Sequence, residues 1–274
     1  MAGTPVREAL DSAVIALSAA GIDTPRLDAE VLLGDVLGLD RSAFVIEPER
    51  TVEGAAVRAF QGAVRRRAFE REPVAYITGV KGFRRLDLHV DARVLIPRPE
   101  TETLVEAALE TLPRGARVAD VGTGSGAVAL ALKDERPDLD VVATDVSEEA
   151  LAVARANAQR LGLDVAFVHG DLLAGVGEVD AVVSNPPYVE DGAELAPEIV
   201  RHEPALALRA GPEGLDVLRL LVPAAAARGA GVVAVEVGAG QAAAVEAMAR
   251  DAGFARSERR ADLAGVDRVV VAWR

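Results

Sequence analysis

The chain has 274 residues, half of them apolar, a formal net charge of −13 and no cysteine. This length allows one large α/β domain plus a small extra module. The lack of cysteine excludes disulfides, thiolate metal sites and cysteine nucleophiles, while the negative charge disfavours direct binding to nucleic-acid phosphates. Because the first ten residues lack a signal-peptide apolar run and no apolar stretch is long enough to span a membrane, we expect a cytoplasmic protein without a membrane partner.

Residues 1–75 are predicted to form a small helical domain. Val6–Ala20 carries apolar residues at helical spacing, and Gly21 is a residue type that readily ends a helix. A second helix is expected to begin near Pro25 and a third to cover about Val52–Glu70. Since no catalytic motif falls in this region, its expected role is contact with a substrate.

Residues 76–97 are predicted to form a β-hairpin that links two domains. Leu86, Leu88 and Val90 alternate with polar residues, which is the period of a half-buried strand. Glycines on the N-terminal side of this run supply turns, and the prolines that follow it mark the boundary with the rest of the chain.

Residues 98–274 alternate short apolar runs with helical stretches. Strands are expected at Arg117–Val121, Val141–Thr144, Val165–Val168, Ala181–Val183, Val232–Val237 and Val269–Ala272. Helices are expected at Ala127–Lys133, Glu148–Leu161, Leu215–Ala227 and Ala242–Asp251. Such alternation predicts the α/β class, with a Rossmann-like domain built on a mainly parallel sheet that is covered by helices on both faces.

A glycine-rich turn follows the first of these strands and opens a predicted helix. Its residues are Gly122, Thr123, Gly124, Ser125 and Gly126. Glycines at such a turn let the backbone bend tightly and approach a ligand that a Cβ atom would exclude. The turn is therefore a candidate cofactor site.

Asp145 ends the next strand, about 20 residues beyond the turn, where doubly wound folds place an acidic residue that binds ribose hydroxyls. NAD would satisfy this pair of features too. However, the glycine spacing is G-x-G-x-G and not the G-x-G-x-x-G that cradles phosphates. S-adenosylmethionine has no phosphate and is therefore favoured. Asp171 and Leu172, after the third strand, would then reach its adenine.

The segment Asn185, Pro186, Pro187 and Tyr188 follows the strand Ala181–Val183, where open α/β sheets bind ligands. The two prolines stiffen it. The Asn185 side-chain oxygen and the Pro186 carbonyl can accept both N–H hydrogens of an amide or aniline-like nitrogen, and the Tyr188 ring can pack on the flat group. Such a nitrogen is a poor nucleophile, so catalysis would come from positioning and from acceptors that favour its developing positive charge.

With these motifs the chain resembles the PrmC/HemK family of protein-glutamine methyltransferases, which modify class 1 peptide-chain release factors. The resemblance runs nearly end to end. It is carried by Leu27–Leu33, Glu72–Gly79, Val94–Glu102, Gly122–Gly126, Asn185–Tyr188 and Asp262–Arg268.

The resemblance implies a helical substrate-recognition domain, a hairpin linker and a methyltransferase domain that uses S-adenosylmethionine. The implied target is the glutamine of a Gly-Gly-Gln loop in a release factor. Gly122–Gly126, Asp145, Leu172 and Asn185 would contact the cofactor, and Asn185–Tyr188 the glutamine. Some relatives carry tryptophan at the position of Leu172, so an aliphatic contact would replace stacking on the adenine here.

Other functions remain open at this point. A glutamine methyltransferase that acts on a ribosomal protein would share the Asn-Pro-Pro-Tyr chemistry, although the N-terminal domain and linker favour release factors. An adenine-N6 methyltransferase of nucleic acids solves a similar problem after flipping a base, but the charge of −13 argues against it. A binding module on a degenerate methyltransferase fold is disfavoured because the glycine turn, Asp145 and Asn185–Tyr188 are all intact.

Overall fold

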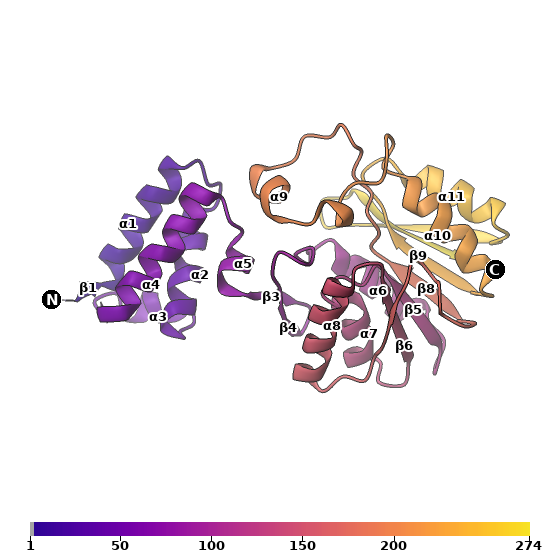
Figure 1. Ribbon diagram of the computed structural model, residues 1–274, viewed down its shortest axis with the longest axis horizontal. Coiled ribbons are helices and arrows are strands. Elements are labelled where there is room, and N and C mark those ends of the chain that lie inside the picture. Colours follow the sequence, from indigo (N-terminus) through magenta and orange to yellow (C-terminus); the bar gives the residue numbers. More distant parts are fainter. Residues whose placement is uncertain (1–2) are drawn as a thin grey trace. The chain divides into compact units, whose positions relative to one another are not determined.

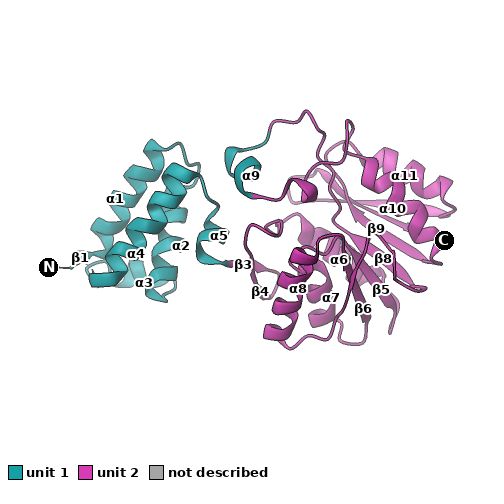
Figure 2. Cartoon of the chain, in the orientation of Figure 1, with its two compact units in different colours: residues 1–79, 195–202 teal, residues 80–194, 203–274 magenta. Residues whose placement is uncertain are grey.

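The computed structural model describes residues 3–274. The chain divides into two compact units (Figures 1 and 2). The helical unit comprises the chain up to Gly79 together with Leu195–His202, and the sheet unit comprises Val80–Glu194 and Glu203–Arg274. None of the helices formed by residues 3–274 is both long and apolar enough to cross a lipid bilayer.

The helical unit is built on a small apolar core that includes Leu10, Leu17, Leu32 and Phe60. Its helices are α1 Val6–Ala19, α2 Pro25–Leu37, α3 Ser42–Ile46, α4 Gly54–Arg65, the π-helical turn η1 Arg66–Glu70, α5 Val74–Thr78 and α9 Pro197–His202. Two short strands, β1 Thr4–Pro5 and β2 Thr51–Val52, pair antiparallel. Apolar residues recur at helical spacing in α1 and α2, so each helix buries one face.

The sheet unit contains a seven-stranded sheet in the order β10-β11-β9-β8-β5-β6-β7. Its strands are β5 Arg117–Val121, β6 Asp140–Asp145, β7 Ala166–His169, β8 Ala181–Ser184, β9 Val232–Glu236, β10 Arg256–Ala261 and β11 Asp267–Trp273. Six of these seven strands run in one direction, and only β11 is reversed, antiparallel to its neighbours β9 and β10. A separate hairpin joins β3 Val80–Phe83 to β4 Leu86–His89.

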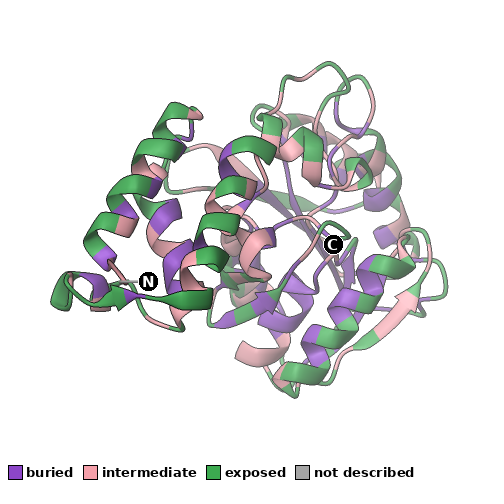
Figure 3. Ribbon diagram, turned by 60° about the vertical axis from the view of Figure 1, so that its left-hand side comes forward, coloured by how far each residue is buried: buried purple, intermediate pink, exposed green. Residues whose placement is uncertain are grey.

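The central strands of the sheet are buried (Figure 3), and an apolar core lies on each side of them. Neighbouring residues of β5 show this directly, because Val118 belongs to one apolar core and Ala119 to the other. The first core also contains residues of α6 Thr101–Thr111, α7 Ala127–Glu135 and α8 Glu148–Leu161, and the second contains residues of α10 Asp216–Ala227 and α11 Ala242–Asp251. A short 3₁₀ turn, η2, covers Ala205–Ala207. The predicted α/β class is therefore confirmed.

Some sequence-based boundaries were wrong. The third helix does not run unbroken over Val52–Glu70, because its last turn widens into η1. Strand β10 was missed because its residues are nearly all exposed and charged, as in an edge strand, and show no apolar alternation. Helix α6 was missed as well. The partition into 1–75, 76–97 and 98–274 remains a prediction; the compact units divide the chain after Gly79 instead.

Candidate active site

The predicted site residues follow adjacent strands of the sheet unit. The glycine turn follows β5, Asp145 ends β6 and Asn185 follows β8. These strands are parallel neighbours, so their carboxyl ends meet at one edge of the sheet. The chain order reverses between β5 and β8, which is the switch point where open α/β sheets form a ligand crevice.

The glycine turn forms a cradle next to this switch point. Gly122 and Gly124 have φ angles of 71° and 56°, in the left-handed region that favours glycine. A Cβ atom added to either would meet no protein atom within 4 Å, so both face open space. The backbone N–H groups of Gly122 and Thr123 each donate to the carbonyl of Thr144 at 2.9 Å, which ties the turn to β6.

A buried asparagine supports the turn from the other side. Asn157 in α8 is fully buried, and its amide donates to the carbonyl of Ser125 at 3.0 Å. The same side chain bonds the backbone N–H and carbonyl of His89 in the β3–β4 hairpin, at 2.8 and 2.9 Å. The hairpin is thereby fixed to the glycine turn by one polar side chain.

A cavity of about 50 Å³ lies against the turn. It is lined by Gly122, Thr123, Gly124, Ser125 and Asn185, which the sequence predicted, and by Leu95, Pro97, Thr101, Asp120, Ala127 and Val128, which it did not. Gly126 is not among these residues; it caps the N-terminus of α7 with a φ of 85°. The cavity lining thus combines glycine backbone, small polar and apolar side chains and one carboxylate.

That carboxylate, Asp120, is 1% exposed. Burial raises the pKa of Asp120 to about 7, although hydrogen bonds from the Thr123 hydroxyl and the Ala129 N–H oppose the shift. A buried carboxyl group that lines a cavity and carries no cationic side-chain partner among these contacts suits a ligand with a positive charge.

Replacing Asp120 with asparagine tests this assignment through stability. The folded chain holds the Asp120 proton up to a pKa of about 7, but the unfolded chain loses it near 3.8. Wild-type stability therefore falls as pH rises through this window. Asparagine mimics the protonated group, so the melting temperature of Asp120→Asn should be closest to that of wild type at about pH 4 and should exceed it by a growing margin as the pH rises to about 8. The same melting difference at both pH values would contradict a raised pKa.

Asp145 reaches the turn through its carboxylate. Oδ2 accepts a hydrogen bond from the Gly124 N–H at 2.9 Å, and Oδ1 accepts one from the Ser147 N–H at 2.9 Å. Each oxygen keeps a second lone pair that could accept a bond from a ligand hydroxyl.

Asp171 and Leu172 are not among the residues that line the cavity. Asp171 is exposed. Leu172 has a left-handed φ of 49°, its carbonyl accepts from the Thr144 hydroxyl at 2.8 Å, and its side chain packs on an apolar core. The proposed contacts of both residues with an adenine stay predictions.

Asn185 and Tyr188 are held by residues that the sequence analysis missed. The Asn185 amide nitrogen donates to the hydroxyl of Thr101, at the start of α6, at 3.0 Å. The Tyr188 hydroxyl donates to Oε1 of Glu236, at the end of β9, at 3.0 Å. Pro186 is buried between them and Pro187 is partly buried. The Tyr188 carbonyl is fixed as well, because it accepts from the Gln241 amide at 3.0 Å.

Glu236 is fully buried. Burial raises the pKa of Glu236, while hydrogen bonds from the hydroxyls of Thr101 and Tyr188 act in the opposite direction. Burial, together with the nearby Glu236 carboxylate, raises the pKa of Tyr188, so its hydroxyl stays a proton donor. The second carboxylate oxygen, Glu236 Oε2, has no hydrogen-bond partner among residues 3–274.

These contacts give the Asn185 side chain a direction. Thr101 has one proton, and an ionised Glu236 can only accept. The Thr101 oxygen accepts from the Asn185 amide nitrogen, so its own proton is left to point toward Glu236, whose pKa it lowers. The Asn185 oxygen is then left for another donor. Thr101 lies within Val94–Glu102, one of the segments that carry the family resemblance. Glu236 could be noticed in the sequence only as an acidic residue at the end of an apolar strand.

Two family models match parts of this chain. A model of the PrmC N-terminal domain matches residues 8–79, and a model of the methyltransferase small domain matches residues 100–212. A methyltransferase from Pyrococcus furiosus shares the fold, with a TM-score of 0.53 and 19% identity over 69% of this chain and 88% of its own. The hMettl16 catalytic domain shares it too, with a TM-score of 0.54 and 18% identity over 80% of each chain.

Closer relatives match almost the whole length. A release factor glutamine methyltransferase from Moorella thermoacetica is 45% identical over 279 aligned residues, which cover 98% of both chains. One from Deinococcus radiodurans is 47% identical over 277 residues, again covering 98% of both chains. The predicted resemblance is confirmed by this identity, and the chain belongs to the release factor glutamine methyltransferase family.

Proposed function

We propose that this chain transfers a methyl group from S-adenosylmethionine to the side-chain amide nitrogen of the glutamine in the Gly-Gly-Gln loop of class 1 release factors. The observation that carries the proposal is the stiff segment Asn185–Tyr188, fixed by Thr101 and Glu236 beside the glycine cradle. Membership of the family supports the same reaction.

S-adenosylmethionine, when bound, supplies an electrophilic methyl group on a positively charged sulfur. The residues of the cradle fit such a ligand: Gly122 and Gly124 leave room for it, Asp145 offers acceptors for ribose hydroxyls, and Asp120 offers a carboxylate for its ammonium group. The roles of these residues are part of the proposal.

Asp145→Ala should weaken S-adenosylmethionine binding by roughly 1–3 kcal/mol, the range for losing a hydrogen bond to a charged group. Part of this loss arises because the Gly124 N–H loses its partner. Isothermal titration calorimetry measures the affinity. Asp164→Ala is the matched control, since it removes an exposed carboxylate for which no cofactor contact is predicted and which does not line the cavity. Unchanged affinity in Asp145→Ala would remove Asp145 from the cofactor site.

The protein residues then have to orient a weak nucleophile. The Asn185 oxygen and the Pro186 carbonyl accept the two amide hydrogens of the substrate glutamine, which aims its nitrogen at the methyl group. Both acceptors also favour the positive charge that develops on that nitrogen. The Tyr188 ring packs on the amide plane and excludes water. After transfer the nitrogen is acidic, so it releases its extra proton without a strong base.

One experiment tests the reaction directly. The chain is incubated with isotope-labelled S-adenosylmethionine and a recombinant class 1 release factor, and the modified residue is located by peptide mass spectrometry. We expect one methyl group on the glutamine of the Gly-Gly-Gln loop, and none on a release factor whose loop glutamine is replaced by alanine. Label at another residue, or no label, would contradict the proposal.

The same assay separates the alternatives. A total ribosomal protein fraction and an adenine-containing oligonucleotide serve as competing acceptors, because the Asn-Pro-Pro-Tyr chemistry suits any planar nitrogen. Preferential methylation of either would replace the release factor as substrate. We further propose a cytoplasmic location, since release factors act on translating ribosomes; recovery of the chain in a membrane or secreted fraction would contradict it.

A further inference from the structure

The loop after Tyr188 leaves the sheet unit and returns to it. Val189 pairs with Arg209 in a parallel bridge, its N–H donates to the Leu208 carbonyl at 2.9 Å, and its own carbonyl accepts from Ala210 at 3.0 Å. These bonds close the base of the loop directly after the Asn185–Tyr188 segment. Between Val189 and Arg209 the chain contains helix α9 and the 3₁₀ turn η2.

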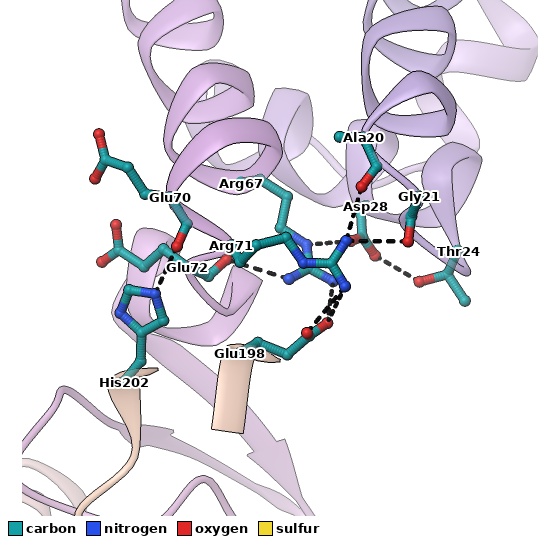
Figure 4. Close-up of polar contacts among 10 residues, drawn as sticks. All are labelled: Ala20, Gly21, Thr24, Asp28, Arg67, Glu70, Arg71, Glu72, Glu198 and His202. Carbon is teal, nitrogen blue, oxygen red and sulfur yellow. Dashed lines mark hydrogen bonds and ion pairs between the residues drawn. The ribbon is translucent and has the colours of Figure 1, made fainter. Parts of the chain in front are cut away.

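The far part of the loop, Leu195–His202, belongs to the helical unit. Glu198 in α9 lies at the centre of the polar contacts between this segment and the other residues of the helical unit (Figure 4). Its carboxylate accepts hydrogen bonds from Arg71 at 3.0 and 3.3 Å and from Arg67 at 3.4 Å. His202 adds a second anchor, since its Nε2 lies 2.8 Å from the Glu70 carbonyl oxygen. The Glu198 side chain is 19% exposed, so these ion pairs are partly shielded from solvent.

The two arginines are held in place by other residues of the helical unit. Arg67 is buried and pairs with buried Asp28 at 2.7 Å. Arg71 donates to the carbonyls of Ala20 and Gly21, at the end of α1, at 2.9 and 3.0 Å. Their guanidinium groups therefore point at Glu198 from positions that do not depend on it. The helical unit therefore contains a preformed binding site for one carboxylate, and Glu198 occupies it.

The backbone around these arginines has an unusual conformation. Residues Arg66–Glu70 form a π-helical turn, which is rare and frequently marks functional sites. Arg71 follows with a φ of 58°, a left-handed conformation that costs free energy in a residue with a side chain. Burial would raise the pKa of Glu198, but its own backbone N–H and the arginines lower it overall, so the carboxylate stays ionised.

The chain re-enters the sheet unit at Glu203, directly after α9. The buried Glu203 carboxylate accepts from the Ile96 N–H at 3.1 Å and pairs with Arg98. Pro97, between these two partners, lines the cavity at the glycine turn. The loop that carries α9 therefore contacts the surroundings of the candidate active site at both ends, next to Tyr188 at its start and through Glu203 after α9.

We infer that Glu198 is a positioning residue for methyl transfer. By anchoring Leu195–His202 on the helical unit, it holds the loop whose base adjoins Tyr188, and through that loop the Asn185–Tyr188 segment. The inference rests on the proposed function. It gives the helical unit a part in turnover that is separate from any contact with the protein substrate.

The test uses the full-length chain with Glu198→Gln, which keeps the shape of the side chain and removes its charge. We expect the saturated single-turnover rate on a release factor to fall about tenfold, since small misplacements of reacting groups cost this much. The release-factor concentration for half-maximal rate and the S-adenosylmethionine affinity should change by less than about twofold. Glu194→Gln, an exposed glutamate of the same loop, is the control and should behave like wild type.

Arg71→Gln and the double variant that combines it with Glu198→Gln complete a double-mutant cycle. If Glu198 acts through Arg71, the double variant should be no slower than Arg71→Gln alone. Losses that multiply, an unchanged rate in Glu198→Gln, or a weaker apparent affinity for release factor at an unchanged maximal rate would overturn the inference. Amide hydrogen exchange across residues 189–202 should accelerate in Glu198→Gln, and unchanged exchange would also overturn the anchoring. If the wild-type chain methylates no release factor, the proposed function is refuted instead. Amide hydrogen exchange would still show whether Glu198 anchors Leu195–His202 on the helical unit.

Discussion

Replacing Asn185 with alanine is expected to lower the single-turnover rate of methyl transfer by about a hundredfold or more, because misplacement near 1 Å can cost that much. The substitution removes the acceptor that orients the substrate amide and also the donor that meets Thr101 at 3.0 Å. Asn185 is partly exposed and no apolar core depends on it, so thermal melts should show a folded protein. A folded Asn185→Ala chain that works at the wild-type rate would refute the proposed mechanism.

Two further substitutions separate the roles within the segment. Asn185→Asp keeps an acceptor but adds a negative charge beside the sulfonium, which stabilises the ground state more than a transition state in which that charge disperses. We expect tight cofactor binding with slow turnover. The sequence analysis gave a role only to the Tyr188 ring, and on that basis Tyr188→Phe would have a mild effect. The structure revises this expectation, since the lost hydroxyl is a donor to buried Glu236.

Glu236→Gln is expected to lower turnover by about tenfold while the melting temperature stays the same or rises. Burial raises the pKa of Glu236, so ionising this carboxyl group costs free energy that a neutral amide of the same shape does not. However, glutamine can donate as well as accept. The Thr101 hydroxyl then has no fixed direction, and the Asn185 amide can turn its nitrogen toward the substrate.

Thr101 supplies the matched controls for this network. Thr101→Ser keeps the hydroxyl and should retain most of the activity, whereas Thr101→Val keeps the shape without the hydroxyl and should lose about as much as Glu236→Gln. Rates are measured by single-turnover transfer to a release factor, and S-adenosylmethionine affinity by calorimetry. If Glu236→Gln lost stability together with activity, Glu236 would have a structural role and not the orienting role assigned here.

The sequence by itself determined the features that depend on neighbouring residues. The range of β5, Arg117–Val121, follows from a short apolar run, and α8 was placed at Glu148–Leu161 by its helical spacing. The glycine turn and the Asn-Pro-Pro-Tyr segment are local as well, because glycine and proline act on their own backbone and on the next residue. Parallel strands then bring these local motifs to one edge of the sheet.

Only the tertiary structure decided which side chains hold these motifs in place. Asn185 meets Thr101 across 84 residues of sequence, Tyr188 meets Glu236 across 48, and Glu198 meets Arg71 across 127. Such pairs have no periodic spacing, since each depends on where whole elements pack. A buried carboxylate such as Glu236 also cannot be distinguished in the sequence from an exposed one. The direction of the Asn185 amide and the anchoring of the α9 loop therefore became visible only once the chain was folded.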